Sequence, residues 1–444
     1  NSNGYDSYYL GNAYLKMIEE GKVPESVVND KAARILRLIF RTSMNRKKPF
    51  GSICTEEHYA AAEAIGNEGI VLLKNAPVAK KSTALLPLKN DYQNILVVGD
   101  NATRKLNEGG GSSELKVKDM VSPLDGLRAI YGDRVKYAQG YAAGQPMYGS
   151  VNEIPQEVQD KLRAEAVAMA KDADVVILVG GLNKNHLQDC EGGDRQSYGL
   201  PFGQEKLIEE LQAVNKNLVL VLLSGNAVEM PWIDKVPAIV QGWYLGSMGG
   251  KSIANVLSGK VNPSGKLPFS FPVKLTDNGA HSFDSLCYPG DGVKQVYKED
   301  ILVGYRWHDT KKIPAAFAFG HGLSYTTFEY GKAVASAKKM TADDQLEISV
   351  KVKNTGAVAG KEVVQLYIGD DKSSVVRPLK ELKHFQKIAL NPGEEQTVTF
   401  IVSADDLKYY DEATKDWKAE AGKFKAYIGS SSADIRTVVP FVLE

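Results

Sequence analysis

A chain of 444 residues exceeds what one hydrophobic core usually supports, so we expect two or three domains. Its 54 basic and 54 acidic residues give a net charge of +0 without a dense basic run, which argues against a nucleic-acid partner. No apolar stretch approaches the ~20 residues that span a bilayer, and 3 isolated cysteines argue against a zinc site and a disulfide framework.

Two helices are expected near the start of the chain, over residues 12–20 and 24–41. Pro24 stands near the first position of the second helix, where its missing N–H costs nothing, and apolar side chains recur at helical spacing over residues 27–39. Two helices cannot bury such a stripe by themselves. We therefore interpret residues 1–45 as the end of a domain whose beginning is absent.

Strand and helix patterns alternate over residues 46–275. Short apolar runs of the kind found in buried parallel strands stand between amphipathic helical patterns. This alternation predicts an α/β sandwich domain, a mostly parallel sheet between helices. Strands are expected at 95–99, 135–137, 175–179, 218–223 and 238–241, and helices at 59–74, 124–131, 157–170, 203–215 and 248–257.

The pattern changes twice in the rest of the chain. Residues 276–330 are irregular and rich in aromatic side chains, which is typical of an ordered, docked linker and not of a flexible tether. Over residues 331–444 the apolar period becomes two, which predicts an antiparallel β-sandwich. Its clearest strands are expected at 346–352, 364–368, 398–402 and 424–428.

A carboxylate lies on a glycine loop directly after the strand expected at 175–179. The loop reads Asp-Cys-Glu-Gly-Gly-Asp-Arg from Asp189 to Arg195. In α/β folds ligands bind at the carboxyl ends of the strands, so Glu191 is a candidate catalytic acid. The alternative on position alone is a solvated loop residue.

A second glycine loop, residues 109–113, follows the strand expected at 95–99 and should lie on the same rim. It lacks the Lys-Ser/Thr ending of a phosphate-binding loop and the spacing of a dinucleotide-binding fingerprint. Gly110 and Ser112 are therefore candidates for contact with substrate. A flexible surface turn is the alternative.

Five separate stretches of the sequence carry a resemblance to one known family. They read GNEGIVLLKN with LPL within 66–88, EGGDR with LP and Gln within 191–204, VNPSGKLP at 261–268, VGYR at 303–306 and FGHGLSYTTF at 319–328. In this order the set resembles glycoside hydrolase family 3, typified by β-glucosidases and β-xylosidases. The resemblance covers nearly the whole chain and implies a fibronectin-III-like fold for the β-sandwich.

The resemblance implies retaining hydrolysis of a β-linked sugar from its non-reducing end. Retaining enzymes use two carboxyl groups about 5–5.5 Å apart, one as nucleophile and one as general acid and base. By resemblance Glu191 is the acid/base. Asp194 and Arg195 follow it on the substrate side, where an ion pair between them is expected to fix the loop, and Asp189 lines the rim or is solvated.

The family's nucleophile is an aspartate in a Ser-Asp-Trp-like stretch of an N-terminal (β/α)8 barrel, and no such stretch occurs in this sequence. Residues 1–45 resemble only the last helices of that barrel. We expect the chain to be a piece of a longer enzyme, which needs the missing N-terminal barrel segment as its partner and is inactive alone. A natural truncation that has lost catalysis is the alternative.

We expect the intact protein to be an exo-acting β-glycosidase for β-linked glucosides or xylosides, either oligosaccharides or aryl and alkyl glycosides. The 6 histidines are scattered, so neither a metal nor another cofactor is expected. By resemblance the protein is expected to be periplasmic or secreted. The alternative function is a non-catalytic sugar-binding or scaffolding module, and a nucleotide-binding α/β protein is a more distant third.

Overall fold

The structure is a computed structural model that describes residues 11–48, 51–78, 83–145, 149–151 and 153–444. The chain divides into two compact units, Asn1–Thr55 and Glu56–Glu444. Each unit has contacts mainly within itself. The larger unit carries the predicted sheet, linker and sandwich, and it holds the candidate site.

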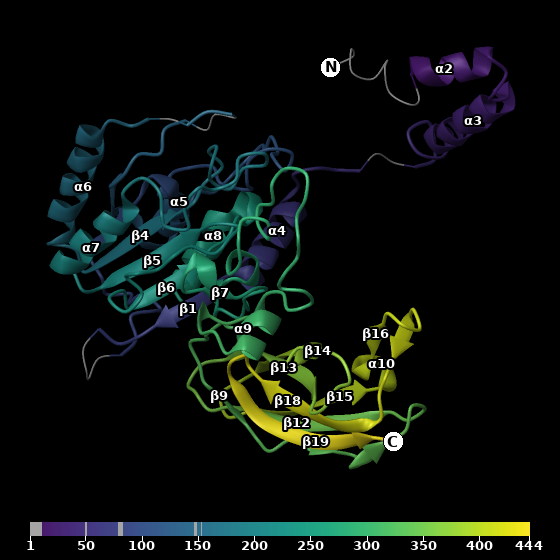
Figure 1. The fold of residues 1–444 in the computed structure, drawn as a ribbon. Coiled ribbons are helices and arrows are strands. Elements are labelled where there is room, and N and C mark those ends of the chain that lie inside the picture. Colours follow the sequence, from purple (N-terminus) through teal and green to yellow (C-terminus); the bar gives the residue numbers. More distant parts are fainter. Residues whose placement is uncertain (1–10, 49–50, 79–82, 146–148, 152) are drawn as a thin grey trace. The chain divides into compact units, whose positions relative to one another are not determined.

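In the first unit, helices α2 (Asn12–Glu19) and α3 (Glu25–Arg41) form where the sequence predicts them (Figure 1). The apolar stripe of α3 has no cover within this unit, since Ile35 and Leu38 are 61% and 62% exposed. The assignment of residues 1–45 to a barrel stays a prediction, and its first ten residues lie outside the described ranges.

The larger unit contains a six-stranded sheet in the order β1-β6-β5-β4-β2-β3. Neighbours from β6 to β3 pair in parallel, and β1 joins the edge antiparallel. The mostly parallel sheet expected from the sequence is therefore confirmed. The strands are β1 (Val71–Asn75), β2 (Ile95–Val98), β3 (Val135–Ala138), β4 (Val175–Gly181), β5 (Leu218–Leu223) and β6 (Ala238–Gln241).

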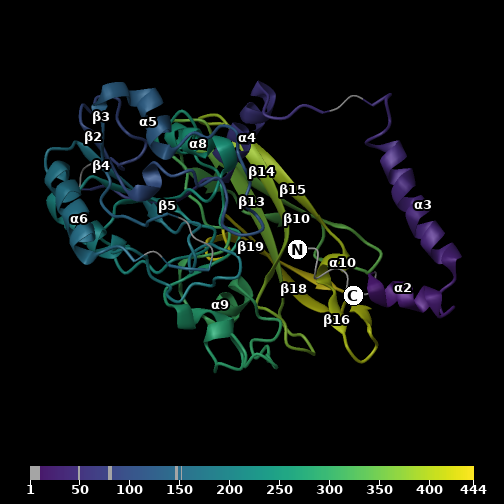
Figure 2. The ribbon, with the colours of Figure 1, turned by 90° about the horizontal axis from the view of Figure 1, so that it is seen from above.

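Helices cover both faces of this sheet (Figure 2). One face packs against α6 (Gln156–Ala170) and α7 (Gln204–Val214). The other packs against α5 (Pro123–Tyr131) and α8 (Gly249–Leu257), with α4 (Glu56–Gly69) in contact with α8. Because both faces are dry, the strands have continuous apolar sequences instead of alternating ones.

One element corrects the sequence prediction. The helix expected over residues 59–74 ends at Gly69, and Val71–Asn75 is the edge strand β1. The side chains of residues 70–73 are all at most 1% exposed, so they are buried toward both faces of the sheet, as a strand permits. A short apolar run gives no periodicity that separates a strand from a helix, and this produced the error.

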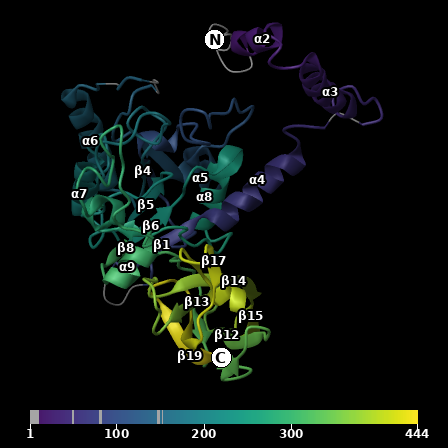
Figure 3. The same ribbon diagram turned by 45° about the vertical axis from the view of Figure 1, so that its right-hand side comes forward.

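The C-terminal part is an antiparallel β-sandwich, as predicted (Figure 3). One sheet joins β12 to β9, β10 and β15, and the other has the order β11-β19-β18-β13-β14. Within the described residues only the short β11–β19 pairing is parallel in these two sheets. The strands are β9 (Phe328–Tyr330), β10 (Val334–Ala335), β11 (Lys339–Met340), β12 (Leu346–Asn354), β13 (Gly360–Asp370), β14 (Glu381–Leu390), β15 (Glu395–Val402), β18 (Gly422–Gly429) and β19 (Ile435–Leu443). Between β15 and β18 lie α10 (Ala404–Leu407) and the hairpin of β16 (Tyr409–Asp411) with β17 (Asp416–Lys418).

The segment between the sheet domain and the sandwich is packed against both. It contains β7 (Phe271–Pro272), which pairs with β8 (Ala315–Phe317), and α9 (Tyr305–Lys311). Helix α9 lies between the two domains (Figure 1, Figure 3). The Tyr305 hydroxyl accepts a hydrogen bond from the N–H of Leu382 in the sandwich at 2.8 Å. The three predicted boundaries between the four segments stay predictions.

An ion pair buried between α9 and the sandwich provides a test of this docking. Lys380 Nζ lies 2.6 Å from Asp309 Oδ2, with side chains 6% and 15% exposed. Burial raises the pKa of Asp309, although Lys380 opposes the shift. We expect Lys380→Ala to lower the free energy of unfolding by about 3 kcal/mol, because it leaves a buried carboxylate without its partner.

Chemical denaturation would measure this loss. The matched control is Lys339→Ala, which removes an exposed partner of Glu444 and should change the free energy of unfolding by less than about 1 kcal/mol. Equal effects of the two substitutions would contradict the buried docking of α9.

Candidate active site

The two glycine loops leave neighbouring strands at the point where the sheet reverses its strand order. The chain passes from β2 to β3 on one side and then to β4 on the other side of β2. In open α/β sheets, ligands bind outside the carboxyl ends of the strands at such a reversal. Residues 109–113 follow β2 and residues 189–195 follow β4, so both predicted loops occupy this position. The longer segment 182–203, which contains residues 189–195, is called the acid loop below.

The two loops pair with each other through their backbones. Gly110 and Cys190 form an isolated parallel bridge. The N–H of Gly110 donates to the carbonyl of Asp189 at 2.7 Å, and the N–H of Glu191 donates to the carbonyl of Gly110 at 3.2 Å. The backbone of Glu191 is therefore held in register against the first glycine loop.

Close approach explains the glycines of the first loop. A Cβ atom on Gly110 would lie 2.8 Å from the carbonyl oxygen of Lys184 and 3.0 Å from Cys190 Sγ. Gly111 has a φ of +88°, and a Cβ atom there would lie 2.4 Å from the Cβ of Glu191. Both positions require glycine because a larger residue would displace the acid loop.

The side chain of Glu191 is exposed and is held by the first loop. Its carboxylate Oε2 accepts a hydrogen bond from the N–H of Ser112 at 2.7 Å. Hydrogen bonds from the hydroxyl and the N–H of Ser112 lower the pKa of Glu191, since they stabilise the charged form. In this chain Glu191 is thus ionised at neutral pH. Ser112, predicted as a substrate contact, touches Glu191, whereas Gly110 lines the pocket described below.

Asp189 is an anchor and not a solvated carboxylate. It lines the pocket, but its oxygens accept hydrogen bonds from the N–H of Gly225 at 2.7 Å, the hydroxyl of Tyr244 at 2.8 Å and the amide of Asn226 at 2.9 Å. Burial and the nearby Asp189 charge raise the pKa of Tyr244, which keeps its hydroxyl a donor. These bonds tie the acid loop to the segments that follow β5 and β6.

The ion pair expected between Asp194 and Arg195 does not form. Arg195 Nη2 donates to the carbonyl of Ala227 at 2.9 Å, and the guanidinium lies 5.9 Å from the ring centroid of Tyr198. Asp194 is exposed and makes no salt bridge within the described part of the chain. The guanidinium is thus engaged by the segment after β5 and by the acid loop's own aromatic ring, and not by the neighbouring carboxylate. Burial lowers the pKa of Arg195.

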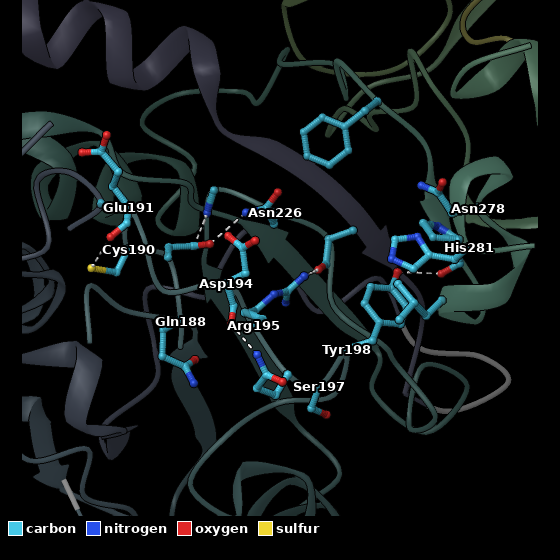
Figure 4. A pocket seen from close by; sticks show the side chains of 18 of the residues that line it. Gln188, Cys190, Glu191, Asp194, Arg195, Ser197, Tyr198, Asn226, Asn278 and His281 are labelled. Carbon is cyan, nitrogen blue, oxygen red and sulfur yellow. Dashed lines mark hydrogen bonds between the residues drawn. The ribbon is translucent and has the colours of Figure 1, made fainter. Parts of the chain in front are cut away.

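A pocket of about 650 Å³ opens beside these residues (Figure 4). Glu191 lies at one end of it, Asp194 and Arg195 lie in the middle, and His281 and Asn278 lie at the other end (Figure 4). The side chains that line it include those of Gln188, Asp189, Glu191, Asp194, Arg195, Tyr198, Asn226, Tyr244, Phe269, Asn278, His281 and Tyr288.

Sequence reasoning missed several residues of this site. Lys184, in the acid loop, lies 2.7 Å from a carboxylate oxygen of Glu114 and 3.5 Å from one of Glu108, which flank the first glycine loop. These partners are 70 and 76 residues away along the chain, so no local motif could identify them. Likewise, Asn226 and Tyr244 are distant from the acid loop in the sequence, and only the fold brings them to the site.

The ionisable groups at this site are carboxylates and one guanidinium. Within the described ranges, no group of three or more His, Cys, Asp or Glu side chains is placed to hold a metal ion. None of the helices described is long and apolar enough to cross a membrane. The charged side chains that line the pocket are the exposed carboxylates of Glu191 and Asp194, the anchored carboxylate of Asp189 and the half-buried guanidinium of Arg195.

The anchoring role of Asp189 predicts a structural effect of its removal. We expect Asp189→Ala to lower the free energy of unfolding by about 2 kcal/mol, because three donors lose a charged acceptor. The control is Asp194→Ala, which removes an exposed carboxylate from the same loop. It should change the free energy of unfolding by less than about 0.5 kcal/mol. Denaturant titration of both variants measures the difference, and a larger loss for Asp194→Ala would reject this assignment.

Two family models match the chain. Residues 70–325 match the model of the glycosyl hydrolase family 3 C-terminal domain, and residues 362–432 match that of a fibronectin type III-like domain. The first match spans the whole parallel sheet, both glycine loops and the segment that carries α9. The second falls within the β-sandwich.

Known proteins with similar sequences and structures bear β-glucosidase names. The chain is 62% identical to beta-glucosidase BoGH3A of Bacteroides ovatus over 99% of its own length and 59% of that protein. It is 39% identical to thermostable beta-glucosidase B of Acetivibrio thermocellus, covering 95% of this chain and 53% of that protein. The crystal structure of DesR, a beta-glucosidase from Streptomyces venezuelae in complex with D-glucose, superposes with a TM-score of 0.86 at 27% identity, over 99% of this chain and 67% of DesR.

The chain thus spans between about half and three fifths of the length of these two sequence relatives. The family match covers more than half of the chain and includes every residue of the candidate site. The fold, an α/β sheet domain followed by a fibronectin-III-like sandwich, agrees with both matches. We conclude that the chain belongs to glycoside hydrolase family 3.

Proposed function

We propose that the chain is the acid/base-bearing part of a retaining, exo-acting β-glycosidase that removes β-linked glucosyl or xylosyl units from the non-reducing end. The observation that carries the proposal is the position of Glu191, held by Ser112 at the switch point of the sheet beside the pocket. The β-glucosidase names of the relatives support the choice of reaction.

In the proposed reaction Glu191 first protonates the leaving oxygen and then activates the water that releases the sugar. The second carboxylate must approach the anomeric carbon with a free oxygen. Asp189 does not suit this role, because both of its oxygens already accept hydrogen bonds. We therefore propose that the nucleophile comes from an N-terminal barrel segment and that the chain is inactive without it.

The barrel segment would also change the protonation of Glu191. As an acid, Glu191 must carry a proton when substrate binds, yet in this chain it is exposed and Ser112 lowers its pKa. Covering the carboxyl group would remove water from it and raise its pKa, as would a nearby second carboxylate. The proposed partner segment thus supplies the nucleophile and the environment that makes Glu191 an acid.

The first test is Glu191→Ala in the whole enzyme, barrel included. We expect kcat/KM for glycosides with poor leaving groups to fall by about 10²- to 10⁴-fold, since these need a proton donor. Substrates with activated leaving groups should lose far less in the glycosylation step. Azide should restore turnover and give a glycosyl azide of retained configuration.

Equal losses on both kinds of substrate would reject Glu191 as the acid. An inverted azide product would reject the retaining mechanism. A wild-type whole protein that binds β-glycosides without hydrolysing them would favour the alternative of a non-catalytic sugar-binding module.

A second test uses the hydroxyl of Ser112. Its hydrogen bond favours the ionised form of Glu191, so Ser112→Ala should raise the pKa of Glu191. The basic limb of the pH profile of kcat/KM reports deprotonation of the acid and should therefore move to higher pH. Ser113→Ala is the control, because the Ser113 hydroxyl bonds to the carbonyl of Gly109 and not to Glu191. A shift to lower pH in Ser112→Ala would contradict the proposed contact.

A further inference from the structure

A cluster of three charged side chains joins the acid loop to both ends of the first glycine loop, residues 109–113. Lys184 Nζ lies 2.7 Å from a carboxylate oxygen of Glu114 and 3.5 Å from one of Glu108. Glu108 directly precedes the first glycine loop, and Glu114 directly follows it. None of these side chains lines the pocket beside Glu191, so the cluster contacts the loop from outside the pocket.

The cluster is shielded from water at its centre. The side chains of Lys184 and Glu108 are 16% and 11% exposed, whereas that of Glu114 is 55% exposed. Burial disfavours the charge of Lys184, yet the two glutamates raise its pKa, so the amino group is charged at neutral pH. Partly buried ion pairs are screened by salt much less than exposed ones. The attraction of Lys184 for both glutamates therefore persists at physiological ionic strength.

The two glutamates depend on the lysine between them. Burial raises the pKa of Glu108, Lys184 opposes this rise, and the charge of Glu114 adds to it. Oε2 of Glu108 is buried and has no hydrogen-bond partner within the described ranges. Because both glutamates contact one Nζ atom, their carboxylates lie close together. Without the lysine they would repel each other across the two ends of a short loop.

The first glycine loop positions Glu191 through its backbone. The N–H of Ser112 donates to Oε2 of Glu191 at 2.7 Å, and the carbonyl of Gly110 accepts the N–H of Glu191 at 3.2 Å. Gly110 and Gly111 have no side chains, and Ser112 is exposed, so no packed side chain fixes this part of the loop. Its position relative to Glu191 therefore depends on how its ends are held.

Lys184 also contacts the first glycine loop with its backbone. Its carbonyl oxygen would lie 2.8 Å from a Cβ atom on Gly110, so the two backbones approach closely there. A change of side chain at position 184 leaves this backbone contact in place. It removes the charge between Glu108 and Glu114 and no group that lines the pocket. The contribution of the charge can therefore be measured by itself.

We propose that Lys184 is a positioning residue for Glu191, which it serves by holding both ends of the first glycine loop through Glu108 and Glu114. The inference rests on the proposed glycosidase function and adds to it a residue outside the pocket that controls the acid/base group. In this role Lys184 touches neither the substrate nor the reacting atoms. It acts through the loop and through Ser112.

The test is Lys184→Met in the whole enzyme, which keeps an unbranched side chain and removes its charge. A displaced acid slows the cleavage of poor leaving groups, so we expect kcat/KM for such glycosides to fall by about 10- to 100-fold. Dinitrophenyl glycosides need no proton donor and should lose far less, which also shows that the variant is folded. Lys184→Gln, which keeps hydrogen-bond donors without the charge, is a second variant and should show a loss of the same kind.

The pH profile gives a readout that a general loss of stability would not change. Hydrogen bonds from Ser112 lower the pKa of Glu191, so a loosened loop should raise it. The basic limb of kcat/KM should then move to higher pH in Lys184→Met. Lys184→Arg keeps the positive charge and should restore most of the activity and the wild-type profile. Amide hydrogen exchange within residues 109–113 should be faster in Lys184→Met than in the wild type.

The matched control is Lys116→Met. Lys116 lies two residues after Glu114, is exposed and makes no ion pair within the part of the chain that the structure describes. Its replacement removes the same charge from the same region. The activity towards both kinds of substrate, the pH profile and the hydrogen exchange should therefore equal those of the wild type.

Equal losses on both kinds of substrate in Lys184→Met, an unmoved pH profile or unchanged hydrogen exchange in residues 109–113 would overturn the inference. So would a Lys184→Arg enzyme as impaired as Lys184→Met. A failure of the proposed function differs from these results, because the wild-type whole enzyme would then hydrolyse neither kind of glycoside. Hydrogen exchange needs no turnover, so it tests the role of Lys184 in the loop in that case as well.

Discussion

The backbone pairing of Gly110 with Cys190 is the contact on which the candidate site depends. It joins two loops that are far apart in the sequence and that leave adjacent strands of one rigid sheet. Backbone hydrogen bonds restrict the relative position of two loops more than contacts between exposed side chains could. The two backbones can approach closely because Gly110 and Gly111 have no Cβ atom. The exposed carboxylate of Glu191 therefore has a defined position without being buried.

The charges around this contact are satisfied in different ways. Asp189 is satisfied by three hydrogen-bond donors, whereas Arg195 has one carbonyl acceptor and a ring face. Glu191 and Asp194 are both exposed, and the hydrogen bonds from Ser112 lower the pKa of Glu191. In the reaction that we propose, Glu191 must first act as an acid, which requires a desolvation that its exposed position does not provide. The proposed chemistry is therefore divided between this chain and the proposed barrel segment.

Periodicity in the sequence identified most of the fold but not all of it. Strands such as Leu218–Leu223 were predicted because their apolar runs are short and bounded by polar residues. The edge strand Val71–Asn75 was mistaken for helix, since four buried residues in a row carry no period. Strands β14 and β19 escaped notice. Much of β14 faces solvent, and the second half of β19 is a nearly continuous apolar run in sequence, although its burial alternates.

The candidate site, like the fold, could be predicted from the sequence only in part. Glu191 could be proposed from a local motif on a strand end, because the motif and its position lie within one stretch of sequence. The acceptor role of Asp189 and the contact of Arg195 with Ala227 depend on residues more than 30 positions away. No pattern within the loop encodes them, and charge adjacency alone suggested an ion pair, whereas Arg195 contacts Ala227 and Tyr198 instead. The pocket residues Asn278, His281 and Tyr288 were missed because their segment was interpreted only as a linker.

That linker connects the pocket to the sandwich through a continuous set of contacts. Trp307 of α9 packs against the segment that carries His281, through Gly279 and the ring of Phe283 at 5.8 Å. Tyr305, the first residue of α9, contacts the sandwich, where its ring meets that of Tyr367 with centroids 5.9 Å apart. A β-sandwich that contributes no residue to the pocket thereby braces one of its walls. The sandwich thus supports the pocket through rigidity and not through contact.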